Sequence, residues 1–139
     1  MILLDRDTWN ILTPATVYNM IVGIGNDVIE IERIKKACEK EAFLARVYTK
    51  HEIEQSRNRM AFFAGNWAVK ESVSKAFGTG VVGFDIRDIE VLRDEKGKPY
   101  VNIFNKANDI KEELNITHIH VSISDSDELV FATAIAESR

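Results

Sequence analysis

The sequence has one cysteine and no long apolar run. Cys38 alone cannot build an intramolecular disulfide framework, and its isolation fits a reducing compartment. No stretch reaches the ~18 consecutive apolar residues of a membrane-spanning helix, so no membrane span is expected. Asp5-Arg6-Asp7 interrupts the apolar N-terminal start, which argues against a secretory signal.

Several chemical motifs are missing as well. No Cys/His spacing typical of zinc ligands occurs. Gly78-Thr79-Gly80 follows a predicted helix instead of preceding one, so it is not a P-loop. The net charge of −4 argues against general nucleic-acid binding. A hydrolase triad could be assembled on paper from Ser122, His120 and Asp125, but no nucleophile elbow accompanies it.

The order of predicted elements indicates an α+β fold. A chain of 139 residues, 45% of them apolar, is expected to form one domain with a mainly antiparallel sheet packed against a long helix. We take Met20 as the natural start, which makes 1–19 an N-terminal extension and 20–139 the domain. The predicted strands cover 20–31, 84–92, 100–103, 118–124 and 129–136, and the predicted helices cover 33–41, 42–47, a short segment capped by Thr49 and Glu52, 60–77 and 106–114.

The long helix carries an unusual polar face. Lys70, Glu71, Ser74 and Lys75 lie near one another on it, and Gly78-Thr79-Gly80 follows at once. This face combines one carboxylate, two ammonium groups and a hydroxyl, and the glycine-rich helix end could approach a ligand closely. The combination indicates phosphate and metal chemistry. The alternative is an i,i+4 pair of Glu71 with Lys75 followed by a glycine cap.

A second carboxylate lies on the first predicted strand. Asp27 shares a face with Ile29 and Ile31, where a charge needs a partner. If this strand packs against the long helix, Asp27 and Glu71 could share a Mg²⁺ ion, with Lys75 neutralising a phosphate. The other interpretation pairs Asp27 with Arg33 or with a turn.

Positive charge is concentrated just after that strand. Residues 33–50 have a net charge of +4, which leaves −8 for the rest of the chain. A basic patch on an acidic protein indicates an acidic partner or substrate. A solvated helix face is the plainer interpretation.

Two long stretches resemble holo-[acyl-carrier-protein] synthases of the 4′-phosphopantetheinyl transferase superfamily. They are 20–34, MIVGIGNDVIEIERI, and 67–80, WAVKESVSKAFGTG; the Gly97-Lys98-Pro99 turn and the strand 120–124 also match. The resemblance implies transfer of 4′-phosphopantetheine from coenzyme A to a serine of apo-acyl carrier protein, with release of 3′,5′-ADP. It also implies a Mg²⁺-dependent, cytoplasmic homotrimer with active sites between subunits.

The resemblance further implies roles for individual residues. Asp27 and Glu71 would hold Mg²⁺, and Glu71 would help deprotonate the acceptor serine, directly or through a metal-bound water. Lys75 would stabilise or protonate the departing phosphate. The residues implied to line the coenzyme A site are Lys70, Ser74, Lys75, Gly78, Thr79, Gly80 and His120. The residues implied to meet the acidic carrier protein are Arg33, Lys35, Lys36 and Lys40.

Two positions depart from the family pattern. Asn66 stands where arginine is frequent, so a phosphate contact is either missing or supplied by another residue such as Arg57 or Arg59. Asp125 stands where histidine commonly follows the strand. Two other functions stay open from the sequence, a non-catalytic coenzyme A or nucleotide binder and a trimeric interaction domain that uses the basic patch.

Overall fold

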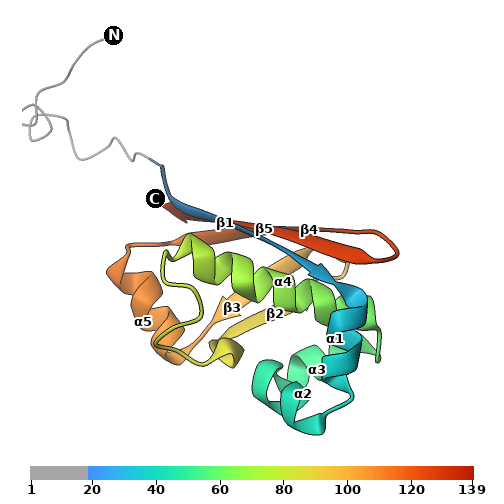
Figure 1. Ribbon diagram of the computed structural model, residues 1–139. Coiled ribbons are helices and arrows are strands. Elements are labelled where there is room, and N and C mark those ends of the chain that lie inside the picture. Colours follow the sequence, from blue (N-terminus) through green and yellow to red (C-terminus); the bar gives the residue numbers. More distant parts are fainter. Residues whose placement is uncertain (1–18) are drawn as a thin grey trace, which may run out of the picture.

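A computed structural model describes residues 19–139 (Figure 1). Strands β1, β5 and β4 form an antiparallel sheet in the order β1-β5-β4, and β2 pairs with β3 in a separate hairpin. The predicted α+β fold is confirmed. The elements are β1 (Met20–Glu30), α1 (Ile31–Cys38), α2 (Glu41–Val47), α3 (Lys50–Ser56), α4 (Met60–Ala76), the 3-10 turn η2 (Ile86–Asp88), β2 (Ile89–Arg93), β3 (Pro99–Ile103), α5 (Asn105–Glu113), β4 (His118–Asp125) and β5 (Leu129–Ser138).

Helix α4 lies at the centre of the fold. It runs beneath the three-stranded sheet, with the β2–β3 hairpin on its other side (Figure 1). Phe63, Val69 and Val73 are buried, and so are the polar residues Asn66 and Lys70. A helix that is buried on several sides has to satisfy its polar side chains within the protein.

Two glycines let β1 approach α4 closely. A Cβ atom at Gly23 would lie 1.9 Å from the carbonyl oxygen of Ala76, and one at Gly25 would lie 1.8 Å from that of Ser72. No side chain fits at such distances, so strand and helix touch backbone to backbone. This close approach brings the β1 side chains beside α4.

One predicted strand begins later than expected. Residues 84–92 alternate in polarity, but the strand starts only at Ile89. Asp85 Oδ1 accepts a hydrogen bond from the backbone N–H of Arg87 at 2.9 Å and caps η2 instead. The capping box of Thr49 and Glu52 at the start of α3 is confirmed. Of the predicted extension only Asn19 is described, so residues 1–18 lie outside the structure's scope.

The outer face of the sheet, away from α4, is apolar and open in the single chain. Ile24 is 64% exposed, Val28 58% and Phe131 45%, and Val22 and Leu129 are exposed beside them. β1 and β4 are the two edge strands of this sheet. Contiguous exposed apolar surface of this kind is typical of protein interfaces. Within residues 19–139, no helix is both long enough and apolar enough to cross a membrane.

Candidate active site

The structure brings Asp27, Glu71 and Lys75 together where β1 crosses α4; we call them the carboxylate–lysine cluster. Lys75 Nζ lies 3.3 Å from Asp27 Oδ1 and donates a hydrogen bond to the backbone carbonyl of Asn26 at 2.8 Å. In the part of the chain that the structure describes, Lys75 is therefore paired across to β1 and not with Glu71. Asp27 pairs with Lys75 and not with Arg33.

Glu71 is half-buried beside Asp27. Burial raises its pKa, the negative charge of Asp27 raises it further, and Lys75 partly counters both. Two adjacent carboxylates of this kind repel each other, and a divalent cation would relieve that repulsion.

The donor set suits magnesium. Mg²⁺ typically takes one or two carboxylates and fills the rest of its octahedron with water and substrate phosphates. Among residues 19–139 no cluster of three acidic, histidine or cysteine side chains occurs, so two carboxylates are the available protein ligands. Asp27 and Glu71 would hold the ion, and the remaining positions would stay open to a pyrophosphate.

The glycine turn closes the C-terminal end of α4. Gly78 and Gly80 have φ angles of +80° and +63°, which glycine adopts without strain. Their N–H groups donate to the carbonyls of Lys75 at 2.9 Å and Ser74 at 3.1 Å. These two donors therefore cap the helix, while Thr79 is exposed between them. Gly78 follows Lys75 by three residues, so the glycine turn adjoins the carboxylate–lysine cluster.

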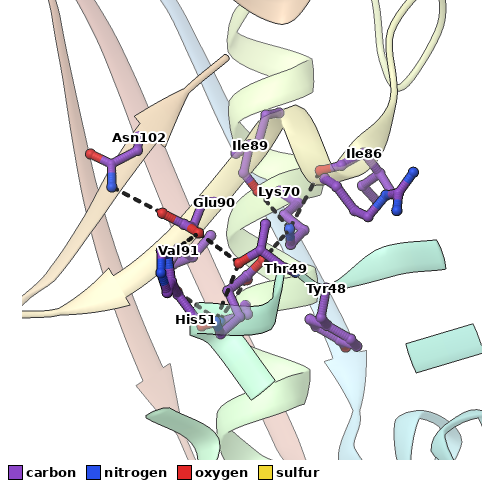
Figure 2. A network of polar contacts seen from close by, with 12 residues as sticks. Tyr48, Thr49, His51, Lys70, Ile86, Ile89, Glu90, Val91 and Asn102 are labelled. Atoms are coloured by element: carbon purple, nitrogen blue, oxygen red, sulfur yellow. Dashed lines mark hydrogen bonds and ion pairs between the residues drawn. The ribbon is translucent and has the colours of Figure 1, made fainter. Parts of the chain in front are cut away.

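Two residues predicted to line the ligand site are buried instead. Lys70 is fully buried; its Nζ donates to Glu52 Oε1 at 2.7 Å and to the carbonyl of Ile89 at 2.5 Å, as Figure 2 shows in part. Ser74 is also fully buried, and its hydroxyl donates to the carbonyl of Lys70 at 2.7 Å. The expectation that these side chains contact coenzyme A is wrong, because neither reaches the surface.

Lys70 belongs to a polar core that the sequence did not reveal. The sequence predicts Glu52 only as a capping residue, yet its second carboxylate oxygen, Oε2, accepts a hydrogen bond from Asn66 Nδ2 at 2.8 Å. Burial lowers the pKa of Lys70, and the charge of Glu52 and its hydrogen bond partly restore it. The ion pair of Glu52 with Lys70 thus links α3 to α4. Its sequence separation of 18 residues explains why spacing alone could not predict it.

A second part of this network holds the β2–β3 hairpin in place. Glu90 accepts hydrogen bonds from Thr49 Oγ1 at 2.6 Å and Asn102 Nδ2 at 3.1 Å, and His51 Nδ1 lies 3.2 Å from it (Figure 2). Burial acts to raise the pKa of Glu90, but these hydrogen bonds together lower it. Glu90 therefore stays ionised and ties α3 to the hairpin.

His120 lies away from the cluster within one chain. Its side chain is exposed on the outer face of the sheet, where Nε2 lies 2.7 Å from Glu137 Oε2 and the ring stacks on His118. Ile119 and Val121 on either side turn toward the core. His120 can thus meet a ligand at the cluster only if another copy of the chain supplies it.

The predicted partner surface lies next to the cluster. α1 begins directly after β1, the strand that carries Asp27. The four basic side chains predicted for this surface are exposed: Arg33, Lys35, Lys36 and Lys40. We call this surface the basic patch. An acidic partner that docks on it would lie close to the end of β1.

A third feature is a hollow of about 1000 Å³ on the other side of α4, which we call the arginine pocket. Arg57, Arg59 and Arg93 line it, and Asp125 lies at its edge at the end of β4. Asn66 does not reach the pocket itself; it is buried, and its Oδ1 accepts a hydrogen bond from Arg93 Nη1 at 2.9 Å. A larger hollow of about 1190 Å³ lies between α3 and the start of α5 and contains none of the predicted site residues.

Comparison with known proteins agrees with these features. Residues 23–134 match the 4′-phosphopantetheinyl transferase superfamily. A holo-[acyl-carrier-protein] synthase of Lachnoclostridium phytofermentans is 48% identical over 118 residues, which cover 85% of this chain and 97% of the relative. One of Fusobacterium nucleatum is 48% identical over 121 residues, covering 84% and 98%.

Solved structures give the same result. A holo-(acyl-carrier-protein) synthase of Bacillus anthracis in complex with CoA (3′,5′-ADP) superimposes with a TM-score of 0.73 and 36% identity, covering 86% of this chain and 99% of that one. A Plasmodium yoelii acyl carrier protein synthase with ADP bound gives a TM-score of 0.80 and 29% identity, covering 88% and 99%. The predicted family is confirmed: this chain belongs to the holo-[acyl-carrier-protein] synthases of the 4′-phosphopantetheinyl transferase superfamily.

Proposed function

We propose that the chain transfers 4′-phosphopantetheine from coenzyme A to a serine of apo-acyl carrier protein, giving holo-acyl carrier protein and 3′,5′-ADP. The observation that carries this proposal is the carboxylate–lysine cluster. Asp27 and Lys75 lie 3.3 Å apart across two elements, with Glu71 half-buried beside them. A protein that only bound coenzyme A would not need such a cluster.

The reaction forms one bond and breaks one. The serine Oγ bonds to the phosphorus that carries the pantetheine arm, and the bond from that phosphorus to the bridging pyrophosphate oxygen breaks. The electron pair leaves with the 5′-phosphate of 3′,5′-ADP. The serine proton passes to the Glu71 carboxylate, directly or through a water molecule.

The other residues of the site act by electrostatic stabilisation of the reacting phosphates. The Lys75 ammonium, half-exposed at the cluster, stabilises negative charge as it develops on the departing phosphate. Asp27 and Glu71 would hold Mg²⁺, which when bound neutralises the pyrophosphate. Gly78 to Gly80 shape the wall next to Lys75, with Thr79 Oγ1 donating to the carbonyl of Gly80.

The basic patch supports an acyl carrier protein as the acceptor. Arg33, Lys35 and Lys36 are exposed on α1, the short helix that follows the strand of Asp27, and Lys40 is exposed just before α2. An acidic carrier that binds there would be steered by charge and would deliver its serine near Glu71. We propose that the protein acts in the cytoplasm, a reducing compartment that fits its single cysteine.

The exposed outer face of the sheet supports self-association, which we propose gives a homotrimer. In a single chain the cluster and the arginine pocket lie on opposite sides of α4: Asp27 and Ile123, which lines the pocket, flank Ala132 of β5 from the two edge strands. A ligand of the size of coenzyme A reaches both only if they come from neighbouring copies. The apolar side chains of β1 and β5 would be covered in the same assembly.

Mass spectrometry tests the proposed function. The protein is incubated with coenzyme A, Mg²⁺ and an apo-acyl carrier protein, with and without a chelator. We expect the carrier to gain the phosphopantetheine mass, and 3′,5′-ADP to appear, only without chelator. Glu71→Gln should abolish both products. Binding of coenzyme A without either product would favour the non-catalytic binder, and retention of activity by Glu71→Gln would refute the role given to this residue.

A further inference from the structure

Lys75 is held by two acceptors on β1. Its Nζ donates to the backbone carbonyl of Asn26 at 2.8 Å and lies 3.3 Å from Asp27 Oδ1. The two acceptors belong to consecutive residues of a strand that Gly25 allows to lie against the backbone of α4. The position of the ammonium is therefore set by the backbone of β1 as well as by the Asp27 carboxylate.

The same ammonium balances both carboxylates of the cluster. Within residues 19–139, the one ion pair that Asp27 makes is with Lys75, and the Asp27 side chain is only 18% exposed. Burial and the charge of Asp27 raise the pKa of Glu71, whereas the charge of Lys75 lowers it. Water screens charges of this kind poorly, because the carboxylates are largely enclosed by β1 and α4.

A divalent cation would use the same carboxylates. Mg²⁺ binds carboxylate oxygens, and Asp27 and Glu71 are the protein groups proposed to supply them. An ammonium and a divalent cation that share one carboxylate repel each other, and this repulsion is strong where the carboxylate is mostly buried. The position in which Lys75 contacts β1 therefore opposes metal binding.

We propose that Lys75 competes with Mg²⁺ for Asp27 in the free enzyme and moves to the pyrophosphate when coenzyme A binds. This inference rests on the proposed function, which supplies the metal and the substrate. The Lys75 side chain is 48% exposed and has a flexible four-carbon stem, so its ammonium can leave β1 without a change of the backbone. Metal affinity is thus low in the free enzyme and rises when the pyrophosphate draws the ammonium away.

Binding of Mn²⁺ and Mg²⁺ to the free protein tests this competition without turnover. Electron paramagnetic resonance measures the concentration of free Mn²⁺, and displacement by Mg²⁺ gives the dissociation constant of that ion. Lys75→Met should tighten both ions by a factor of about 3 to 10, the range expected for a partly exposed ion pair. Loss of a residue that helps to bind the metal would weaken them instead.

Three further variants separate the charge of Lys75 from other effects. Lys75→Arg keeps the positive charge and should bind Mn²⁺ about as weakly as the wild type. Lys96→Met removes the same charge from an exposed position in the β2–β3 turn and should leave the affinity unchanged. Adding Asp27→Asn to Lys75→Met should abolish the tight binding, which places the ion at the cluster. If Lys75→Met does not fold, Lys75→Gln repeats the test with the same loss of charge.

The outcomes distinguish this competition from the proposed function. Unchanged or weaker Mn²⁺ binding by a folded Lys75→Met variant would overturn the competition, even if the wild type transfers phosphopantetheine. Failure of both the wild type and Lys75→Met to bind Mn²⁺ would overturn it as well. Tighter binding by Lys75→Met that Asp27→Asn abolishes, together with absence of transfer by the wild type, would contradict the proposed function and leave the competition supported.

Discussion

Replacement of the buried lysine Lys70 is predicted to damage stability and not substrate binding. Lys70→Met removes the two hydrogen bonds of Nζ to Glu52 and Ile89 and leaves the Glu52 carboxylate buried without its counter-charge. Breaking a buried pair by removing one partner costs about 3–5 kcal/mol. Glu52 still accepts from Asn66 at 2.8 Å and from the Thr49 N–H at 3.1 Å, so we expect the lower end, about 3 kcal/mol.

Thermal unfolding at a fixed protein concentration measures this loss. For a chain of this size, about 3 kcal/mol corresponds to a fall in Tm of roughly 12 °C. The double variant Lys70→Met with Glu52→Gln should recover most of the loss, because no unpaired charge stays buried. Below the melting temperature, KM for coenzyme A should be unchanged. A variant with nearly wild-type Tm and a tenfold higher KM would refute the structural role of Lys70.

Three further predictions concern packing, pH and the partner surface. Gly25→Ala should destabilise the fold by about 3 kcal/mol in urea unfolding, because its Cβ would lie 1.8 Å from a backbone oxygen of α4; Gly65→Ala, whose Cβ meets only side-chain atoms at 3.4 Å or more, should cost far less. The pKa of Glu90 is lowered in the folded state, so its ionised carboxylate stabilises the fold at pH values above the unfolded pKa of about 4.3. This stabilisation is lost as the pH falls through the lower pKa of the folded state. The Tm difference between wild type and Glu90→Gln should thus shrink on acidification toward pH 3, and a constant difference would contradict this. Changing both Lys35 and Lys36 to glutamine should lower kcat/KM for the carrier protein about tenfold at low salt and much less at high salt, with coenzyme A affinity unchanged; an unchanged kcat/KM would exclude the basic patch as the docking surface.

The three residues of the carboxylate–lysine cluster could each be singled out from sequence because the pattern around each of them is local. Asp27 interrupts an alternating strand, and Glu71 and Lys75 are one helical turn apart. The contact of Gly23 and Gly25 with α4 that brings Asp27 to this helix is a feature of the tertiary fold. Periodicity predicted the order and type of the helices and strands, while several bounds differ by a few residues, as in α1, which was expected at 33–41 and lies at Ile31–Cys38. The strand expected from residue 84 failed because Asp85 offers the backbone a competing cap.

Local sequence patterns could not predict which polar residues are buried. Lys70 is adjacent to Glu71 in sequence, but one position on a helix is a rotation of about 100° and turns Lys70 into the core. Its partner Glu52 and the partners of Asn66 come from α3 and β2, which only the tertiary fold brings near. The hydrogen bond from Arg93 to Asn66 has the same origin, since it spans 27 residues.

The rate of phosphopantetheine transfer by Lys75→Met tests the central claim most directly. Lys75 is half-exposed, so its replacement should leave the fold intact, as the Tm will verify. Loss of one group that stabilises charge in the transition state costs about 10²- to 10³-fold in kcat. We therefore predict that holo-carrier protein, followed by mass spectrometry at saturating coenzyme A, forms at least about 100 times more slowly than with the wild type. Formation at the wild-type rate by a folded Lys75→Met variant would contradict the assignment of the cluster as the catalytic site.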